Sequence, residues 1–347
     1  MITVGIIANP ASGKDIRRLV AYGTVFDNQE KVNIVRRLLL GLEAAGVERV
    51  YYMPDYYQIV PKAVEGVCCW QPLSMEVIPA DMAATGTQWD SLLAAGKMRQ
   101  AGAGCLITLG GDGTNRIVAK GCGDVPLVPV STGTNNVFPE MVEGTVAGLA
   151  AGIAARAGKT AGQGILRTKK LIIYQNGCPV DIALVDAVVL DGTFAGARAV
   201  WQPETMRQAV LTRGEPHYLG ISAIGGNLHP VGAGEAKGLS LCFGEGGREV
   251  LAPIAPGLIA PVRVKHYEVL NEGAFARVLK GSCMLALDGE REVEVAEGDE
   301  VSIQLTFDGP LVVDVKAVLA QAAKEKVFID KNKLANCTRK GVYDNGD

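Results

Sequence analysis

A glycine-rich segment, Gly110-Gly111-Asp112-Gly113-Thr114, carries the clearest chemistry in this sequence. It follows an apolar run at 104–109 that is short enough for a buried strand, and residues 117–120 read as the first turn of a helix. Such a junction is a usual place for a phosphate, because glycine accepts positive φ and a helix N-terminus presents unpaired N–H groups. We therefore expect the amides of Gly110, Gly111 and Gly113 to hold phosphates, with Thr114 beside them as the helix N-cap.

Asp112 is the unusual residue of this segment, since a carboxylate repels a polyphosphate. Its presence is explained if it binds Mg²⁺ or takes a proton from a substrate. The alternative interpretation is a tight turn in which Asp112 only bonds its own backbone. The dinucleotide fingerprint is excluded because Arg116 replaces its third glycine, and no Gly-Lys-Ser/Thr phosphate loop is present. We favour a catalytic role for Asp112.

Two further polar segments follow predicted strands. Asn9-Pro10-Ala11-Ser12-Gly13 follows the run 2–8, and Thr132-Gly133-Thr134-Asn135-Asn136 follows the run 125–130. Either segment alone also reads as a plain turn. Because the carboxyl ends of parallel strands meet at one edge of a sheet, we expect the three segments to form one nucleotide site. The residues that we expect to contribute from these two segments are Asn9, Ser12, Thr132, Gly133, Asn135 and Asn136.

The fold class predicted from these patterns is α/β with a second, all-β domain. Strand-like runs at 2–8, 50–53, 75–79, 104–109 and 125–130 alternate with helical runs at 27–45, 89–100 and 142–157, which indicates a doubly wound parallel sheet. We place this domain at 1–140, with a C-terminal return at 317–347 that docks a helix on it. The tail at 332–347 is polar and is expected to be loosely held.

Residues 160–316 are predicted to form the β-rich domain. Asn176-Gly177 is a strong hairpin signal between runs at 169–174 and 179–190. Further runs at 218–223, 239–243, 259–266, 284–287, 292–295 and 301–307 follow at short intervals, and residues 203–211 are predicted to be the one helix among them.

Composition excludes several classes of protein. With 347 residues, 48% hydrophobic and 20% charged, the chain resembles a soluble two-domain enzyme. A net charge of −3 without a basic cluster argues against nucleic acid as the partner. Eight cysteines without Cys-x-x-Cys spacing indicate reduced thiols in a cytoplasmic protein, and three histidines show no metal-ligand spacing. No signal peptide or membrane span is expected.

These motifs together resemble the NAD kinase and diacylglycerol/sphingosine kinase superfamily. The segment at 110–114 is similar to its most specific signature, and those at 9–13 and 132–136 are similar to the lipid-kinase branch. Residues 222–230 and 252–256 are similar to NAD kinase segments instead. Over nearly its full length the chain most resembles the acetoin-catabolism X subfamily of ATP-NAD-kinase-like proteins. The resemblance implies a sandwich-like second domain, an ATP site between the domains and a homodimer.

The departures from this family bear on the substrate. Residues 183–186 stand where NAD kinases carry an Asn-Glu pair that binds NAD, and residues 214–218 replace their Thr-Gly-Ser-Thr-Ala-Tyr segment. A site built on polar contacts discriminates through them, so the acceptor is expected to differ from that of NAD kinases.

We therefore expect transfer of a phosphoryl group from ATP, with Mg²⁺, to a hydroxyl of a small acceptor, NAD being one candidate. Asp112 would bind Mg²⁺ or take the hydroxyl proton. Asp288 and Glu290, in an Asp-Gly element similar to one found late in both branches, are further candidates for the base or metal ligand; a plain β-turn explains them equally well. The alternatives are a non-catalytic nucleotide sensor and a lipid kinase.

Overall fold

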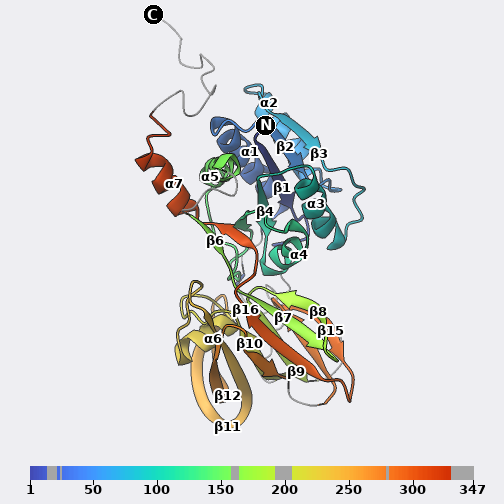
Figure 1. Ribbon diagram of the computed structural model, residues 1–347, viewed down its shortest axis with the longest axis vertical. Helices are drawn as coiled ribbons and strands as arrows, with labels where there is room; N and C mark the ends of the chain where they lie inside the picture. The colour runs from blue at the N-terminus through green and yellow to red at the C-terminus, as the bar shows by residue number, and fades with distance from the viewer. Residues whose placement is uncertain (14–21, 24–25, 158–163, 192–204, 279–280, 330–347) are drawn as a thin grey trace, which may run out of the picture.

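The computed structural model describes residues 1–13, 22–23, 26–157, 164–191, 205–278 and 281–329. These residues form two bodies, one with helices around a sheet and one built mainly of strands, joined at a narrow waist (Figure 1). The tail predicted at 332–347 lies outside the described residues. The proposed division of the chain into 1–140 and 160–316 remains a prediction.

The first body contains a seven-stranded sheet in the order β3-β2-β1-β4-β5-β17-β6. The strands are β1 Thr3–Ala8, β2 Arg49–Tyr52, β3 Glu76–Pro79, β4 Cys105–Gly110, β5 Leu127–Ser131, β6 Ile165–Arg167 and β17 Leu311–Val313. All the pairings are parallel except that of β6 with β17. β1 and β4 are buried along their whole length, as expected for parallel strands that are covered on both faces.

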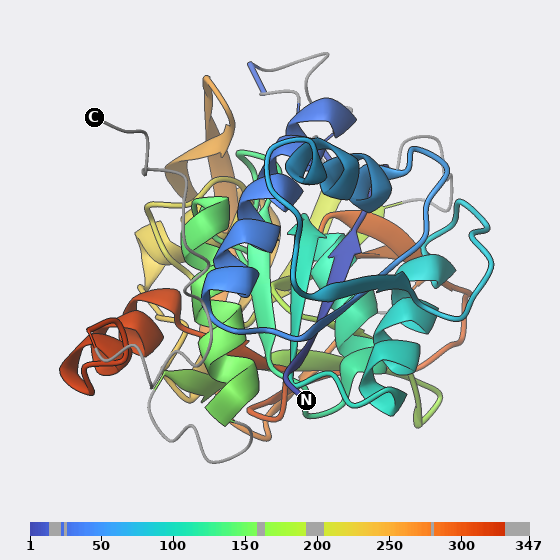
Figure 2. The same cartoon turned by 90° about the horizontal axis from the view of Figure 1, so that it is seen from above.

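Helices cover both faces of this sheet, as Figure 2 shows. They are α1 Asn28–Ala44, α2 Ile59–Cys68, α3 Trp89–Gln100, α4 Asp112–Cys122, α5 Gly144–Ala157 and α7 Val315–Lys324. One hydrophobic core joins α1, α2, α5 and α7 to the sheet, and a separate core joins α3 and α4 to it. The predicted doubly wound sheet is confirmed, and α7 docks on α5 of the first body as expected.

The second body contains two antiparallel sheets. The six-stranded sheet has the order β12-β11-β10-β9-β14-β15, and the four-stranded sheet has the order β13-β16-β7-β8. Their strands are β7 Lys170–Gln175, β8 Cys178–Ala183, β9 Asp186–Asp191, β10 Met206–Leu211, β11 Lys237–Ala255, β12 Leu258–Asn271, β13 Phe275–Arg277, β14 Cys283–Leu287, β15 Glu290–Val295 and β16 Val301–Thr306. One core contains residues of both sheets, so the two sheets pack face to face as predicted.

The sequence patterns are wrong about several elements of the chain. The described part of the predicted helix at 203–211 is β10, a central strand whose pairing with β9 and β11 outweighs its local sequence. The predicted strand at 218–223 overlaps α6, Ile221–Leu228, which is a helix. The single run expected at 179–190 is divided into β8 and β9 by a turn, and α2 was not predicted.

The Asn176-Gly177 hairpin is confirmed. Both residues have positive φ, 53° and 79°, and the turn joins β7 to β8. None of the helices in the described part of the chain is long and apolar enough to cross a membrane.

Candidate functional site

The glycine-rich segment lies where β4 ends and α4 begins. Asp112 is the first residue of α4 and Gly111 is its N-cap, so the prediction that Thr114 is the N-cap is wrong. Gly111 offers no side-chain cap, which leaves the first-turn N–H groups of α4 without a side-chain acceptor. Thr114 instead lies inside the helix, where its Oγ1 accepts a hydrogen bond of 2.8 Å from Asn9 Nδ2.

The glycines of this segment are explained by close packing, because none of Gly110, Gly111 and Gly113 has a positive φ. The expectation of a left-handed turn here is therefore wrong. A Cβ atom on Gly110 would lie 2.5–2.6 Å from side-chain atoms of Thr114. A Cβ on Gly111 would lie 2.7 Å from Oδ1 of Asn136, and one on Gly113 would lie 2.8 Å from a Glu290 carboxylate oxygen.

These contacts predict opposite outcomes for two alanine substitutions. Gly110→Ala forces a methyl group against the buried, β-branched Thr114 and is expected to lower the free energy of unfolding by about 1–3 kcal/mol. Gly113→Ala meets only the end of a flexible side chain and gains about 1 kcal/mol of helix propensity, so its net effect should be small. Urea denaturation of the two variants measures the difference; equal losses would contradict the packing explanation.

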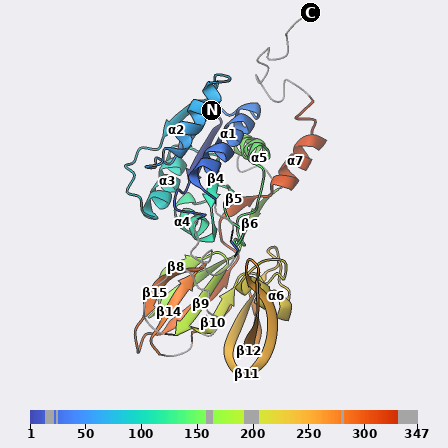
Figure 3. The ribbon, with the colours of Figure 1, turned by 180° about the vertical axis from the view of Figure 1, so that it is seen from behind.

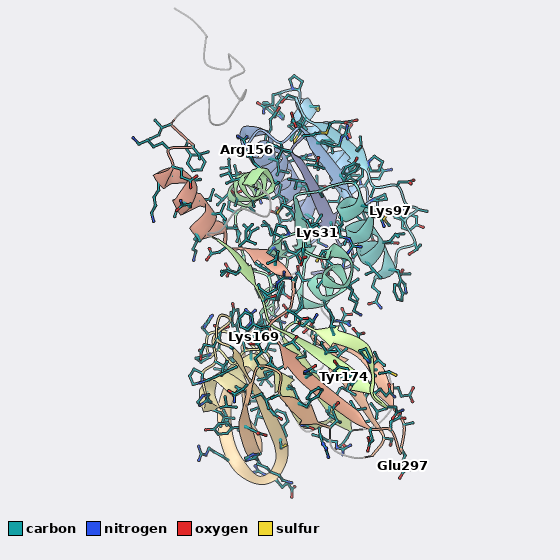
Figure 4. All side chains as sticks on the ribbon, in the orientation of Figure 1. Lys31, Lys97, Arg156, Lys169, Tyr174 and Glu297 are labelled. Carbon is teal, nitrogen blue, oxygen red and sulfur yellow. The ribbon has the colours of Figure 1, made fainter. Side chains whose placement is uncertain are left out.

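A buried lysine, which was not predicted from the sequence, binds backbone carbonyl groups of the segment at 9–13. Lys31, on α1, is fully buried, and its Nζ donates to the carbonyl oxygens of Asn9 at 2.9 Å and Ser12 at 2.7 Å. Figure 4 places Lys31 inside the first body. The signal was present in the sequence, because Lys31 shares the apolar stripe of Val35 and Leu38 on α1.

The third segment joins the other two. Ser12 Oγ and Thr132 Oγ1 are 3.0 Å apart, and Asn136 Nδ2 donates to Ser131 Oγ at 2.7 Å. The carbonyl oxygen of Gly133 accepts from Ser131 Oγ, and Asn135 is partly exposed on the same loop. The three segments therefore meet at one sheet edge, as expected, although their contact with a nucleotide remains a prediction.

Asp112 binds the backbone of a different segment from its own. Its carboxylate accepts N–H donors from Val137 at 3.0 and 3.1 Å and from Phe138 at 2.7 Å. Burial and, next, the charge of Asp288 raise the pKa of Asp112 to about 7, although the two amides and Arg213 oppose the shift. Asp112 is thus neither a simple turn former nor an ordinary surface carboxylate.

Asp288 is a buried acceptor at the turn between β14 and β15. Its φ of 51° and the 82° of Gly289 show the predicted Asp-Gly turn. Its carboxylate accepts N–H donors from Leu184 at 2.9 Å, Val185 at 2.7 Å and Asp186 at 3.2 Å. Burial raises the pKa of Asp288, while these amides and Arg116 lower it.

Glu290 approaches α4 from the second body. Its carboxylate oxygen lies close to Gly113 in the first turn of α4, so it is positioned near the same helix N-terminus as Asp112. Figure 3 shows α4 directly above β8 and β15. The structure therefore brings Asp112, Asp288 and Glu290 to one region between the two bodies.

Arg116 of α4, which is fully buried, connects the first body to carboxylates of the second. Arg116 Nη1 lies 3.2 Å from an Asp181 carboxylate oxygen and its Nε lies 3.8 Å from Asp288. Lys120, one helical turn after Arg116, lies 2.5 Å from Asp181. This network could not be predicted from the local sequence, because the carboxylate partners of Arg116 are 65 and more residues away.

Known proteins match the chain along most of its length. Residues 4–157 match the family model of the ATP-NAD kinase N-terminal domain, and residues 169–308 match that of the acetoin catabolism protein X C-terminal domain. Acetoin catabolism protein X of Cupriavidus necator is 41% identical over 336 residues, which cover 94% of this chain and 93% of that protein. The chain belongs to the acetoin catabolism protein X family. It is a member of the NAD kinase-like group, as its sequence indicated.

The residues of this family member suit a polyphosphate at the first turn of α4. Uncapped N–H groups and three side-chain hydroxyls, those of Ser12, Thr114 and Thr132, are donors of the kind that phosphate oxygens require. Within the described residues, no group of three His, Cys, Asp or Glu side chains could hold a metal ion. Mg²⁺ commonly binds through one or two carboxylates together with substrate phosphates, and Asp112 and Glu290 are the carboxylates beside the glycine segment.

Proposed function

We propose that this protein is an ATP-dependent phosphotransferase that phosphorylates a hydroxyl group of a small acceptor. The observation that supports this most strongly is the placement of Asp112, with a pKa of about 7, at an uncapped helix N-terminus where three polar segments meet. A general base works best when its pKa lies near the working pH. The name of the Cupriavidus necator relative points to acetoin catabolism as the setting.

In the proposed reaction the amides of Gly111, Gly113 and Thr114 would bind the phosphates of ATP. Asp112 would take the proton of the acceptor hydroxyl. The hydroxyl oxygen would form a bond to the γ-phosphorus of ATP, and the bond between this phosphorus and the oxygen of the β-phosphate would break, which releases ADP. Mg²⁺, when bound, neutralises charge on the phosphates. The bonds from Val137 and Phe138 fix the carboxylate in one orientation, which reduces the loss of entropy on reaching the transition state.

Incubation of the purified protein with Mg-ATP and a metabolite extract tests the proposal. Mass spectrometry should find an acceptor that gains one phosphoryl group while ADP accumulates, and heat-inactivated protein should give neither. Tight ATP binding in calorimetry, with no phosphorylated product from a broad acceptor panel that includes NAD and diacylglycerol, would refute transfer.

A nucleotide sensor is the second candidate, and one observation favours it. Both carboxylate oxygens of Asp112 already accept backbone N–H bonds, so the resting structure commits them to Val137 and Phe138. In a sensor, these bonds would serve only to fix the loop that follows β5. The calorimetric outcome above is the result expected of a sensor.

A further inference from the structure

Arg213 is a buried guanidinium at the junction of the two bodies. It follows β10 and is 7% exposed. Its Nη1 reaches the Val137 carbonyl oxygen at 3.5 Å, a long hydrogen bond, and its guanidinium carbon lies 5.9 Å from the centre of the Phe138 ring. Its Nε is buried and has no hydrogen-bond partner among the described residues.

No carboxylate among the described residues contacts Arg213, although Asp112 interacts with its charge at longer range. No Asp or Glu oxygen among these residues lies within 4.0 Å of the guanidinium. Glu215, two residues further on, has a buried carboxylate oxygen that likewise lacks a described partner, so the two charges do not pair. A buried cation without an anion is unfavourable, and a guanidinium offers paired donors that match phosphate or carboxylate oxygens.

A second buried cation, Lys169, adds to the positive charge around Arg213. Lys169 is 1% exposed, and its Nζ donates to the carbonyl oxygens of Gly232 at 2.8 Å and Lys237 at 2.7 Å. Burial, and then the charge of Arg213, lower the pKa of Lys169 to about 8. Figure 4 shows Lys169 at the waist between the two bodies. Two buried cations thus lie near each other, and among the described residues neither has a carboxylate oxygen within 4.0 Å, although Glu235 and Glu215 act on Lys169 at longer range.

Arg213 and the proposed base, Asp112, bind the same residue, Val137. Val137 donates its N–H to Asp112 and accepts from Arg213 at its carbonyl oxygen, so the two side chains bind opposite ends of one residue. Arg213 belongs to the second body, whereas the glycine segment belongs to the first. The half-buried Tyr218 interacts electrostatically with both Arg213 and Asp112. Arg213 therefore reaches, from the second body, the same backbone segment that fixes the carboxylate of Asp112.

We propose that Arg213 binds an oxyanion, a phosphate or a carboxylate, carried by the acceptor whose hydroxyl faces Asp112. The substrate class is then a hydroxyl compound with an anionic group rather than a neutral alcohol. The role of the acceptor rests on the proposed function, but the binding of an oxyanion at Arg213 does not.

The test compares wild-type protein with Arg213→Gln and with Arg263→Gln as a matched control. Arg263 is well exposed and lies 4.0 Å from Glu249, so its replacement removes the same charge away from the junction. The nucleotide site is first saturated with Mg²⁺ and a non-hydrolysable ATP analogue. Inorganic phosphate and malonate are then titrated by calorimetry, with chloride at equal ionic strength as the baseline.

At least one oxyanion should bind wild type and Arg263→Gln alike and should bind Arg213→Gln at least tenfold more weakly. A preference for phosphate over malonate would identify a phosphorylated acceptor, and the reverse a carboxylated one. The Nε–H signal of Arg213 in a ¹⁵N NMR spectrum should shift as the oxyanion binds. If Arg213→Gln fails to fold, Arg213→Lys keeps the charge but loses the paired donors, and should still weaken binding.

Equal affinity in wild type and the Arg213 variants, or no oxyanion binding and no shift of the Nε–H signal in wild type, would overturn the assignment. The two proposals fail separately. Oxyanion binding through Arg213 without any phosphorylated product would leave this site standing and remove the phosphotransferase. Phosphoryl transfer with unchanged oxyanion binding in Arg213→Gln would do the opposite.

Discussion

Asp112→Asn is expected to lower the turnover of phosphoryl transfer by about a hundredfold to ten-thousandfold while the fold stays intact. General-base catalysis commonly contributes a factor of this size, and an amide cannot take the proton of a hydroxyl. Asparagine has nearly the shape of aspartate and keeps one oxygen to accept from the amide of Val137 or Phe138. Steady-state kinetics measures the loss, and circular dichroism checks the fold.

Asp81→Asn is the matched control, because Asp81 is fully exposed and its only described ion pair is with Lys97 at 3.7 Å. It should retain wild-type turnover. Turnover of Asp112→Asn close to that of wild type would remove Asp112 from the mechanism and leave its carboxylate as a structural acceptor.

The ionisation of Asp112 should make both the stability and the turnover of the protein depend on pH. The folded protein holds the Asp112 proton up to a pH of about 7, whereas the unfolded chain releases it near 3.8. The contribution of Asp112 to stability is therefore present at low pH and is lost as the pH rises through this window. Turnover should rise over the same range, because the base must be ionised. Asp112→Asn should show neither change.

The alternation of strand-like and helical runs, together with the residue types found in turns, made much of the fold predictable. The central parallel strands β1 and β4 are continuous apolar runs, and the turn residues Asn176 and Gly177 dictate their hairpin locally. The errors lie where long-range pairing decides. Met206–Leu211 is a strand because β9 and β11 flank it, and no local signal reports those partners.

The candidate site was likewise predictable only where local sequence determines the structure. Sequence spacing correctly brought the segments at 9–13, 110–114 and 132–136 to one edge, since strand order follows from the fold class. It misread the glycines, whose reason is the proximity of Thr114 and Asn136 rather than a positive φ. Arg116 and Arg213 were missed because their significance depends on burial at a junction between distant parts of the chain.

Asp288→Ala is expected to lower the free energy of unfolding by about 3–5 kcal/mol, the loss usual when one partner of a buried ion pair is removed. The substitution leaves the buried N–H groups of Leu184 and Val185 without their acceptor and removes a carboxylate from the fully buried Arg116. Asp299→Ala is the control: Asp299 also accepts several hydrogen bonds in the second body, but it is partly exposed to solvent. Urea denaturation should show a much smaller loss for Asp299→Ala than for Asp288→Ala, because water can replace the lost acceptor.

Asp288→Asn separates the structural part of Asp288 from its electrostatic part. Asparagine keeps one acceptor for the amides of 184–186, so the variant should be less destabilised than Asp288→Ala. It removes the negative charge that helps to raise the pKa of Asp112, so the rise of turnover with pH should move to lower pH. Measurement of kcat against pH in both proteins gives the shift. An unchanged profile would mean that Asp288 does not act on Asp112, and a complete loss of turnover in the folded variant would give Asp288 a direct part in the reaction.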